Sequence, residues 1–348
     1  MNGIHGRAAR GLLAAIASGA LVASLVACAT TAPGSTAANS TPDSTTDSTT
    51  ASTPPTADTS DQVADVFEIP HAAGSVAVSG GAVWVLPHLD QVALRIDPDT
   101  GEVTELPLPG VGAEITASDT EVWASVSHPS TFAPIGLVRI DSTTSTVTHV
   151  VDGTTTFPHL IGDTVWALAS DGVMHGYSRT DATEVATFET GVVGGGAAEA
   201  GGYLWPGNPS VGYRFDPADA SMLDVTDLGL VSLAEAGGRI WGTPFSEAGG
   251  ALSSYEPDGT DVRRADLPEG MLVYLDAVPI DDDRFWIVVA ERGAAPHSQV
   301  AEFDAVTGEI GQVLTFPGKL ENGIDSDGDC VWGPILRQPK VVRVCPTG

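Results

Sequence analysis

The chain has 348 residues, with 45 acidic and 15 basic side chains and a formal net charge of −30. A surface this acidic repels phosphate backbones, so nucleic acid is not an expected partner. The many Gly, Ala and Val residues are typical of a GC-rich genome such as those of actinobacteria, and they carry no functional information.

The first 27 residues have the order of an export signal. Arg7 and Arg10 precede an apolar run from Gly11 to Val26, which is too short and too rich in Ala and Gly for a membrane span. The run ends in Leu25-Val26-Ala27-Cys28, which resembles the lipobox of bacterial lipoproteins. That resemblance implies cleavage before Cys28 and acylation of its sulfur, and so a place on the extracytoplasmic face of the cell membrane. An ordinary secretory signal with a chance cysteine is the alternative.

Residues 28–62 form the predicted linker. After Cys28, 17 of the next 34 residues are Ser or Thr, and none is aromatic, Leu, Ile or Val. Such a segment has too little apolar surface to fold, so we expect a disordered tether about 30 Å in reach.

Residues 63–348 contain a repeat marked by tryptophan. Successive Trp residues are 36 to 46 residues apart, and each follows a Val, Ile, Leu or Phe in a short apolar segment. A period near 40 with short strands predicts an all-β fold, a seven-bladed β-propeller of four-stranded antiparallel blades. We expect the rings to pack between blades rather than to form a ligand platform. The seven residues are Trp84, Trp123, Trp166, Trp205, Trp241, Trp286 and Trp332.

The ends of the repeat region predict how the ring closes. The last unit has three predicted strands, at 323–326, 329–334 and 340–345, and lacks a fourth. The segment 63–69 alternates apolar and polar residues ahead of the first unit, as an edge strand does. We therefore expect it to complete the last blade as its outer strand, which also removes an exposed sheet edge.

The cysteine count agrees with export. Lipidation would use Cys28, which leaves Cys330 and Cys345 as a pair. A hairpin turn centred on Arg337-Gln338 would place these two opposite each other on neighbouring strands, so we predict a disulfide.

Histidines and carboxylates supply the candidate site. In a propeller, the blade-entry loops and the loops between second and third strands share one face. We place His71 and His159 in entry loops, after the parallel phrases Ile69-Pro70 and Phe157-Pro158, and His88, His128 and His297 in second-to-third-strand loops. Loop residues of this kind could bind a divalent cation, the one cofactor that they suggest. The full candidate set is His71, His88, His128, His159, His297, Glu114, Glu199 and Glu235.

Two acidic runs favour turns over metal loops. The run Asp325-Ser326-Asp327-Gly328-Asp329 lacks the closing acidic residue of a calcium-binding loop and falls at a predicted hairpin. The run 281–283 occupies the equivalent hairpin of the sixth unit. The chain has no Gly-x-Ser-x-Gly and no His-Glu-x-x-His motif.

The first repeat carries a family resemblance. Its segments Val83-Trp84-Val85 and Leu94 to Val103 resemble repeats of the YVTN/NHL-like and virginiamycin B lyase-like seven-bladed propellers. The resemblance covers residues 63–346 as a blade pattern. The lyase family uses His and Glu residues with magnesium, but no residue here can be matched to them individually, so the activity is not carried over.

Two functional hypotheses remain. The first is a monomeric, membrane-anchored propeller that binds a protein or a small polar ligand without catalysis. The second is a metal-assisted lyase or hydrolase that acts at the face lined by His and carboxylate residues.

Overall fold

The computed structural model describes residues 62–153, 155–169, 172–190, 197–207, 212–216, 221–226, 230–244, 251–291, 299–320, 323–328 and 330–347. The predicted signal, Cys28 and nearly all of the predicted linker lie outside this range. Every described residue belongs to one compact unit, within residues 52–348. No helix of the described part is long and apolar enough to cross a membrane.

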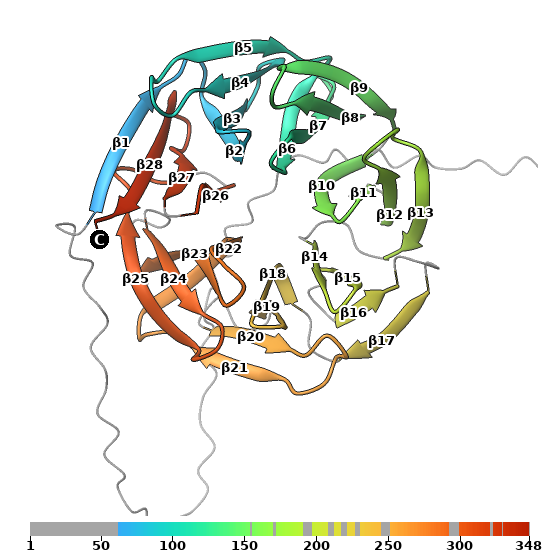
Figure 1. The fold of residues 1–348 in the computed structure, drawn as a ribbon, viewed down its shortest axis with the longest axis vertical. Helices are drawn as coiled ribbons and strands as arrows, with labels where there is room; N and C mark the ends of the chain where they lie inside the picture. Colours follow the sequence, from blue (N-terminus) through green and yellow to red (C-terminus); the bar gives the residue numbers. More distant parts are fainter. Residues whose placement is uncertain are drawn as a thin grey trace, which may run out of the picture. The chain divides into compact units, whose positions relative to one another are not determined.

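The described chain is all β, with seven four-stranded antiparallel sheets arranged around a ring (Figure 1). Blade 1 contains β2 (Ala73–Ser79), β3 (Ala82–Pro87), β4 (Val92–Ile96) and β5 (Val103–Pro107). Blade 2 contains β6 (Val111–Ala117), β7 (Glu121–Ser127), β8 (Pro134–Asp141) and β9 (Thr146–Asp152), and blade 3 contains β10 (Thr155–Ile161), β11 (Thr164–Ala169), β12 (Val173–Ser178) and β13 (Glu184–Glu189).

The remaining blades repeat this order. Blade 4 contains β14 (Ala197–Ala200), β15 (Tyr203–Pro206), β16 (Gly212–Phe215) and β17 (Met222–Thr226). Blade 5 contains β18 (Leu230–Ala236), β19 (Arg239–Pro244), β20 (Ala251–Tyr255) and β21 (Arg263–Asp266), and blade 6 contains β22 (Met271–Pro279), β23 (Arg284–Glu291), β24 (Gln299–Asp304) and β25 (Glu309–Thr315). Blade 7 contains β26 (Asp325–Ser326), β27 (Val331–Pro334), β28 (Lys340–Pro346) and β1 (Gln62–Glu68).

The ring has two distinct faces. Entry loops and second-to-third-strand loops meet on one face, which we call the entry face; there the backbone N–H of His88 donates to the carbonyl of Ala72. First-to-second and third-to-fourth turns meet on the other, the turn face, where Ser79 Oγ donates to the carbonyl of Ser118 in the next blade. The first strand of each blade lies nearest the axis and the fourth lies at the rim (Figure 1).

The last blade is built from both ends of the domain. Strand β1 pairs antiparallel with β28, from Gln62 opposite Pro346 to Glu68 opposite Lys340. The Gln62 side chain also bonds the backbone of Thr315 in blade 6, donating through Nε2 at 2.6 Å and accepting through Oε1 at 2.7 Å. The first described strand is therefore held by the last blade and by its neighbour.

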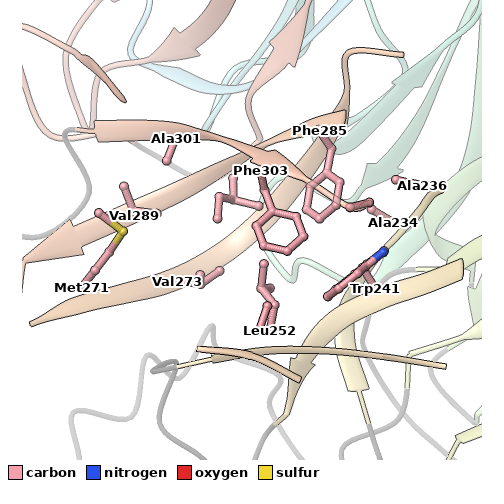
Figure 2. Packing of buried hydrophobic residues seen from close by; sticks show 13 residues of the cluster. Ala234, Ala236, Trp241, Leu252, Met271, Val273, Phe285, Val289, Ala301 and Phe303 are labelled. Carbon is pink, nitrogen blue, oxygen red and sulfur yellow. The ribbon is translucent and has the colours of Figure 1, made fainter. Parts of the chain in front are cut away.

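The tryptophans pack between blades, as the repeat predicts. Trp332 of blade 7 lies in a cluster with blade 1 residues such as Val83 and Ile96, and Trp84 lies in a cluster with blade 2 residues. Figure 2 shows the same arrangement between blades 5 and 6, where Trp241 meets Phe303 edge-on at 4.9 Å between ring centroids. Burying each ring removes a large apolar area from water, so the interfaces between blades form the core.

The residue two positions before each Trp often ties the second strand to the third. In blades 2, 4, 5 and 6 the tie is an ion pair, a cation–π contact or a hydrogen bond. In blade 7 it is the predicted disulfide, with Cα atoms 4.2 Å apart. These pairs are Glu121–Arg139, Tyr203–Arg214, Arg239–Ser254, Arg284–Glu302 and Cys330–Cys345.

Candidate functional site

Two of the predicted site residues, His88 and Glu114, line a common pocket on the entry face. The pocket has a volume of about 150 Å³ and lies between the first strands of blades 1 and 2. Ser75 also lines it; this residue is only 5% exposed, and its hydroxyl has no hydrogen-bond partner in the described structure. A buried hydroxyl without a partner is unusual, because the lost hydration costs about 1–3 kcal/mol.

Irregular strand pairing shapes this pocket. The pairing of β2 with β3 shifts register at Gly74, and that of β6 with β7 shifts across Ala113 and Glu114. Extra residues of this kind bend a strand and redirect its side chains. Gly74 permits a close approach, since a Cβ there would lie 2.7 Å from the carbonyl oxygen of Leu86.

The other two described entry-face histidines have their own local partners. His71 Nδ1 lies 3.1 Å from Asp90 and its Nε2 lies 3.5 Å from Glu105, so it ties the entry loop to blade 1. His128 Nδ1 accepts from the backbone N–H of Ser130 at 3.3 Å within a single hairpin loop. Both positions agree with the predicted loops, but neither side chain lines the pocket of His88.

The same face presents two large apolar side chains. Leu89 is 69% exposed and Phe132 is 53% exposed, each in the second-to-third-strand loop of its blade. Phe132 has a φ of 54°, a left-handed conformation that is unfavourable for a bulky residue. The loop enforces it: the N–H of Phe132 donates to the carbonyl of His128, and the N–H of His128 donates to that of Ala133, both at 2.8 Å.

The position predicted for His159 is wrong. His159 lies within β10 opposite Trp166, toward the turn face, and not in an entry loop. The register of β10 shifts between Thr156 and Pro158, and β10 is an edge strand of its sheet; both features accommodate a proline. Phe157-Pro158 therefore belongs to the strand, although it looks like the loop phrase Ile69-Pro70.

His159 and Glu235 line a second pocket, which we call the axial pocket, at the turn-face end of the inner strands. Its volume is about 550 Å³. The lining residues come from five inner strands, β6, β10, β14, β18 and β22, and from the turns after β10 and β22. They are Thr116, His159, Leu160, Ile161, Gly162, Ala197, Ala198, Leu233, Ala234, Glu235, Ala277, Pro279, Ile280, Asp281 and Asp282.

Burial perturbs two of the titratable groups that line this pocket, His159 and Glu235. Desolvation lowers the pKa of His159 to about 4, so its imidazole is neutral at physiological pH. Burial raises the pKa of Glu235, and the nearby negative charge of Asp282 raises it further. The Nε2 atom of His159 is buried without a hydrogen-bond partner in the described structure.

The described structure does not place the side chains of the two remaining candidates. His297 lies outside the described residues, and of Glu199 only the backbone is described, in β14 opposite Leu204. Of the six candidates with described side chains, His88 and Glu114 line one pocket, His159 and Glu235 line another, and His71 and His128 line neither. Within the described part of the chain no group of three or more His, Cys, Asp or Glu residues is placed to hold a metal ion. A cation site and a metal-assisted reaction thus stay predictions.

The acidic runs form turns, as predicted. Asp327 accepts from the backbone N–H of Cys330 at 3.1 Å and from the indole N–H of Trp332 at 2.9 Å, between β26 and β27. Asp281 accepts from the N–H of Asp283 at 3.0 Å, between β22 and β23. Sequence reasoning missed Ser75, Leu89 and Phe132 as site residues, because a bulge and an exposed loop side chain leave no periodic signal.

Comparison with known proteins supports the fold. No family model and no curated protein matches the chain. A chain in the solved structure titled "Crystal Structure of Mitotic Checkpoint Complex" is similar to it, with a TM-score of 0.64 and 12% sequence identity, over 92% of this chain and 99% of that chain. The topology and this similarity together identify the described domain as a seven-bladed β-propeller.

Proposed function

We propose that this protein is a lipoprotein, anchored through Cys28 on the extracytoplasmic face of the membrane, whose propeller binds a partner protein at its entry face. Three features support the proposal. The lipobox-like segment and the Ser/Thr-rich tether precede the domain. The Cys330–Cys345 disulfide suits an oxidising compartment. Propellers commonly serve as protein-binding scaffolds, because their loops gather on a rigid ring.

We propose the entry face as the binding surface because Leu89 and Phe132 are exposed there on neighbouring blades. Aromatic side chains such as that of Phe132 are enriched at protein interfaces relative to the rest of the protein surface. The hairpin bonds fix the backbone of Phe132 at a positive φ, so its ring projects from a defined position.

Charge indicates the chemistry of the partner. With a net charge of −30, this protein would attract a basic surface and repel nucleic acid and anionic lipid headgroups. We therefore expect a protein partner with an apolar pocket inside a rim of Lys and Arg. We also propose that the domain is related to the YVTN/NHL-like propellers, because its first repeat resembles theirs.

Co-purification from native membranes tests the proposed face. The full-length protein would be compared with the pair Leu89→Ser, Phe132→Ser and with the control pair Val185→Ser, Val262→Ser, whose valines are 56% and 55% exposed elsewhere on the domain. We expect one partner to be recovered with the wild type and the control pair, and to be lost with the entry-face pair. Equal recovery with all three proteins would refute the proposal.

A further inference from the structure

The loop that presents Leu89 on the entry face is held on both sides of that residue by the entry loop of blade 1, which joins β1 to β2. On one side, the backbone N–H of His88 donates to the carbonyl of Ala72 at 3.2 Å. On the other side, His71 Nδ1 lies 3.1 Å from Asp90 Oδ2. The position of Leu89 therefore depends on two contacts with the entry loop.

The entry loop is itself bound to a different blade. The N–H of Ile69 donates to the carbonyl of Pro339 at 2.9 Å, and the N–H of Ala73 donates to that of Gln338 at 3.1 Å. Both acceptors belong to the loop between β27 and β28 of blade 7. Because the backbone on either side of His71 is fixed in this way, its side chain can restrain the Leu89 loop rather than move with it.

A carboxylate lies near each ring nitrogen of His71. Nδ1 is close to Asp90, and Nε2 lies 3.5 Å from Glu105 Oε1 on β5. This Nε2 atom is buried and has no hydrogen-bond partner in the described structure. An imidazolium donates from both nitrogens, whereas a neutral imidazole donates from only one. Only the charged ring can therefore bond both carboxylates at once.

Other titratable side chains on the elements packed around His71 have different surroundings. His88 lines the pocket that Glu114 also lines. Lys340 pairs with Glu68 at 3.1 Å within blade 7, and Arg337 is exposed in the loop before it.

The arginine of β4 lies on the other side of its sheet. Arg95 pairs with Thr104, whereas Glu105 pairs with Leu94, and successive side chains of a strand point to opposite faces. The charge of His71 is thus the variable charge that acts directly on Asp90 and Glu105.

We propose that His71 is a pH-dependent positioning residue for the partner contact: its protonated ring joins Asp90 to Glu105 and holds Leu89 in place, and its neutral ring releases one of the two carboxylates. This inference rests on the proposed function of the entry face and describes its regulation. The partner would be bound more tightly at acidic than at alkaline pH.

Hydrogen exchange of the full-length protein, measured by mass spectrometry at about pH 5 and about pH 8, tests the proposal, since histidine changes charge in this range. After correction for the intrinsic exchange rates, the amides of residues 88–91 should exchange at least threefold faster at the higher pH. His71→Gln and Glu105→Gln should each remove this difference, because neither variant can form both ion pairs. The control His128→Gln removes a histidine from the same face and should keep the difference.

Three outcomes would overturn the proposal. The first is equal exchange of residues 88–91 in the wild type at the two pH values. The second is a pH difference that persists in His71→Gln. The third is an equal loss of the difference in His128→Gln, which would assign it to the general charge of the face. The measurement follows the loop and needs no partner, so this proposal and that of partner binding can fail separately.

Discussion

Asp325 of the last blade accepts a hydrogen bond from the backbone N–H of Val78 in the first blade, at 2.6 Å, across 247 positions of sequence. This bond links the innermost strands of blades 7 and 1. Farther from the axis, the Cys330–Cys345 disulfide ties the residue before β27 to β28, and β1 pairs with β28 at the rim. The junction of the two chain ends is therefore held at three distances from the axis.

Asp325 should make stability depend on pH in an unusual direction. Burial raises its pKa from 3.8 to about 6, so between these values the folded protein binds more protons than the unfolded chain. The contribution of this group to stability is then fully present below the unfolded pKa of 3.8 and is lost as the pH rises through about 6. Unfolding of wild type and Asp325→Asn should be compared from pH 4 to 7. We expect the wild type to lose stability relative to the variant across this range, and parallel profiles would contradict the assignment.

The disulfide should contribute measurably to the closed ring. It closes a loop with a sequence separation of 15, and such a loop corresponds to ~3 kcal/mol in the chain-entropy model. Denaturant unfolding of Cys330→Ser, Cys345→Ser should show a loss of about this size. Wild type in reductant is the control and should match the variant, whereas a variant as stable as oxidised wild type would show that the bridge is dispensable.

Gly176 should be required by the ring of Trp166. The two residues are opposite each other on β11 and β12, and a Cβ at position 176 would lie 2.7 Å from the indole. Overpacking of this kind typically costs about 1–3 kcal/mol, so Gly176→Ala should lower stability by that amount. In a double-mutant cycle, Gly176→Ala should lower stability much less when Trp166→Phe is also present, because the smaller ring leaves room for the added methyl group. Strictly additive effects would count against this contact.

Cys28 lies outside the described residues, so its role is tested only by experiment. Cys28→Ala should release the protein from the membrane or block its processing, because the acyl chains would have no attachment point. Fractionation and mass spectrometry of the mature N-terminus measure this. A control, Cys330→Ser, Cys345→Ser, should stay membrane-bound. An unmodified N-terminus at another residue would contradict lipidation.

The repeat allowed most of the fold to be predicted. A Trp in the second strand of every blade marks the interfaces, and the turn at Arg337 and Gln338 correctly placed Cys330 opposite Cys345. These features are local and periodic, so the sequence records them directly. The all-β class, the blade number and the packing role of the tryptophans are confirmed.

The candidate site was harder to predict, since it depends on irregularities. The bulge in β10 turns an apparent loop phrase into strand and carries His159 toward the turn face. Bulges in β2 and β6 decide that Ser75 and Glu114 share a pocket. A one-residue shift in pairing changes where a side chain lies without changing the apolar pattern, so the sequence alone could name residue types but not their groupings.

The most direct test of the account is site-specific photo-crosslinking of the anchored protein in its own membranes. A photoreactive amino acid would replace Leu89 or Phe132 on the entry face, and Val185 or Val262 as similarly exposed controls. The account predicts that positions 89 and 132 crosslink to the same partner protein while positions 185 and 262 do not. Crosslinks to that partner from the control positions only, or no crosslink from either entry-face position, would contradict it.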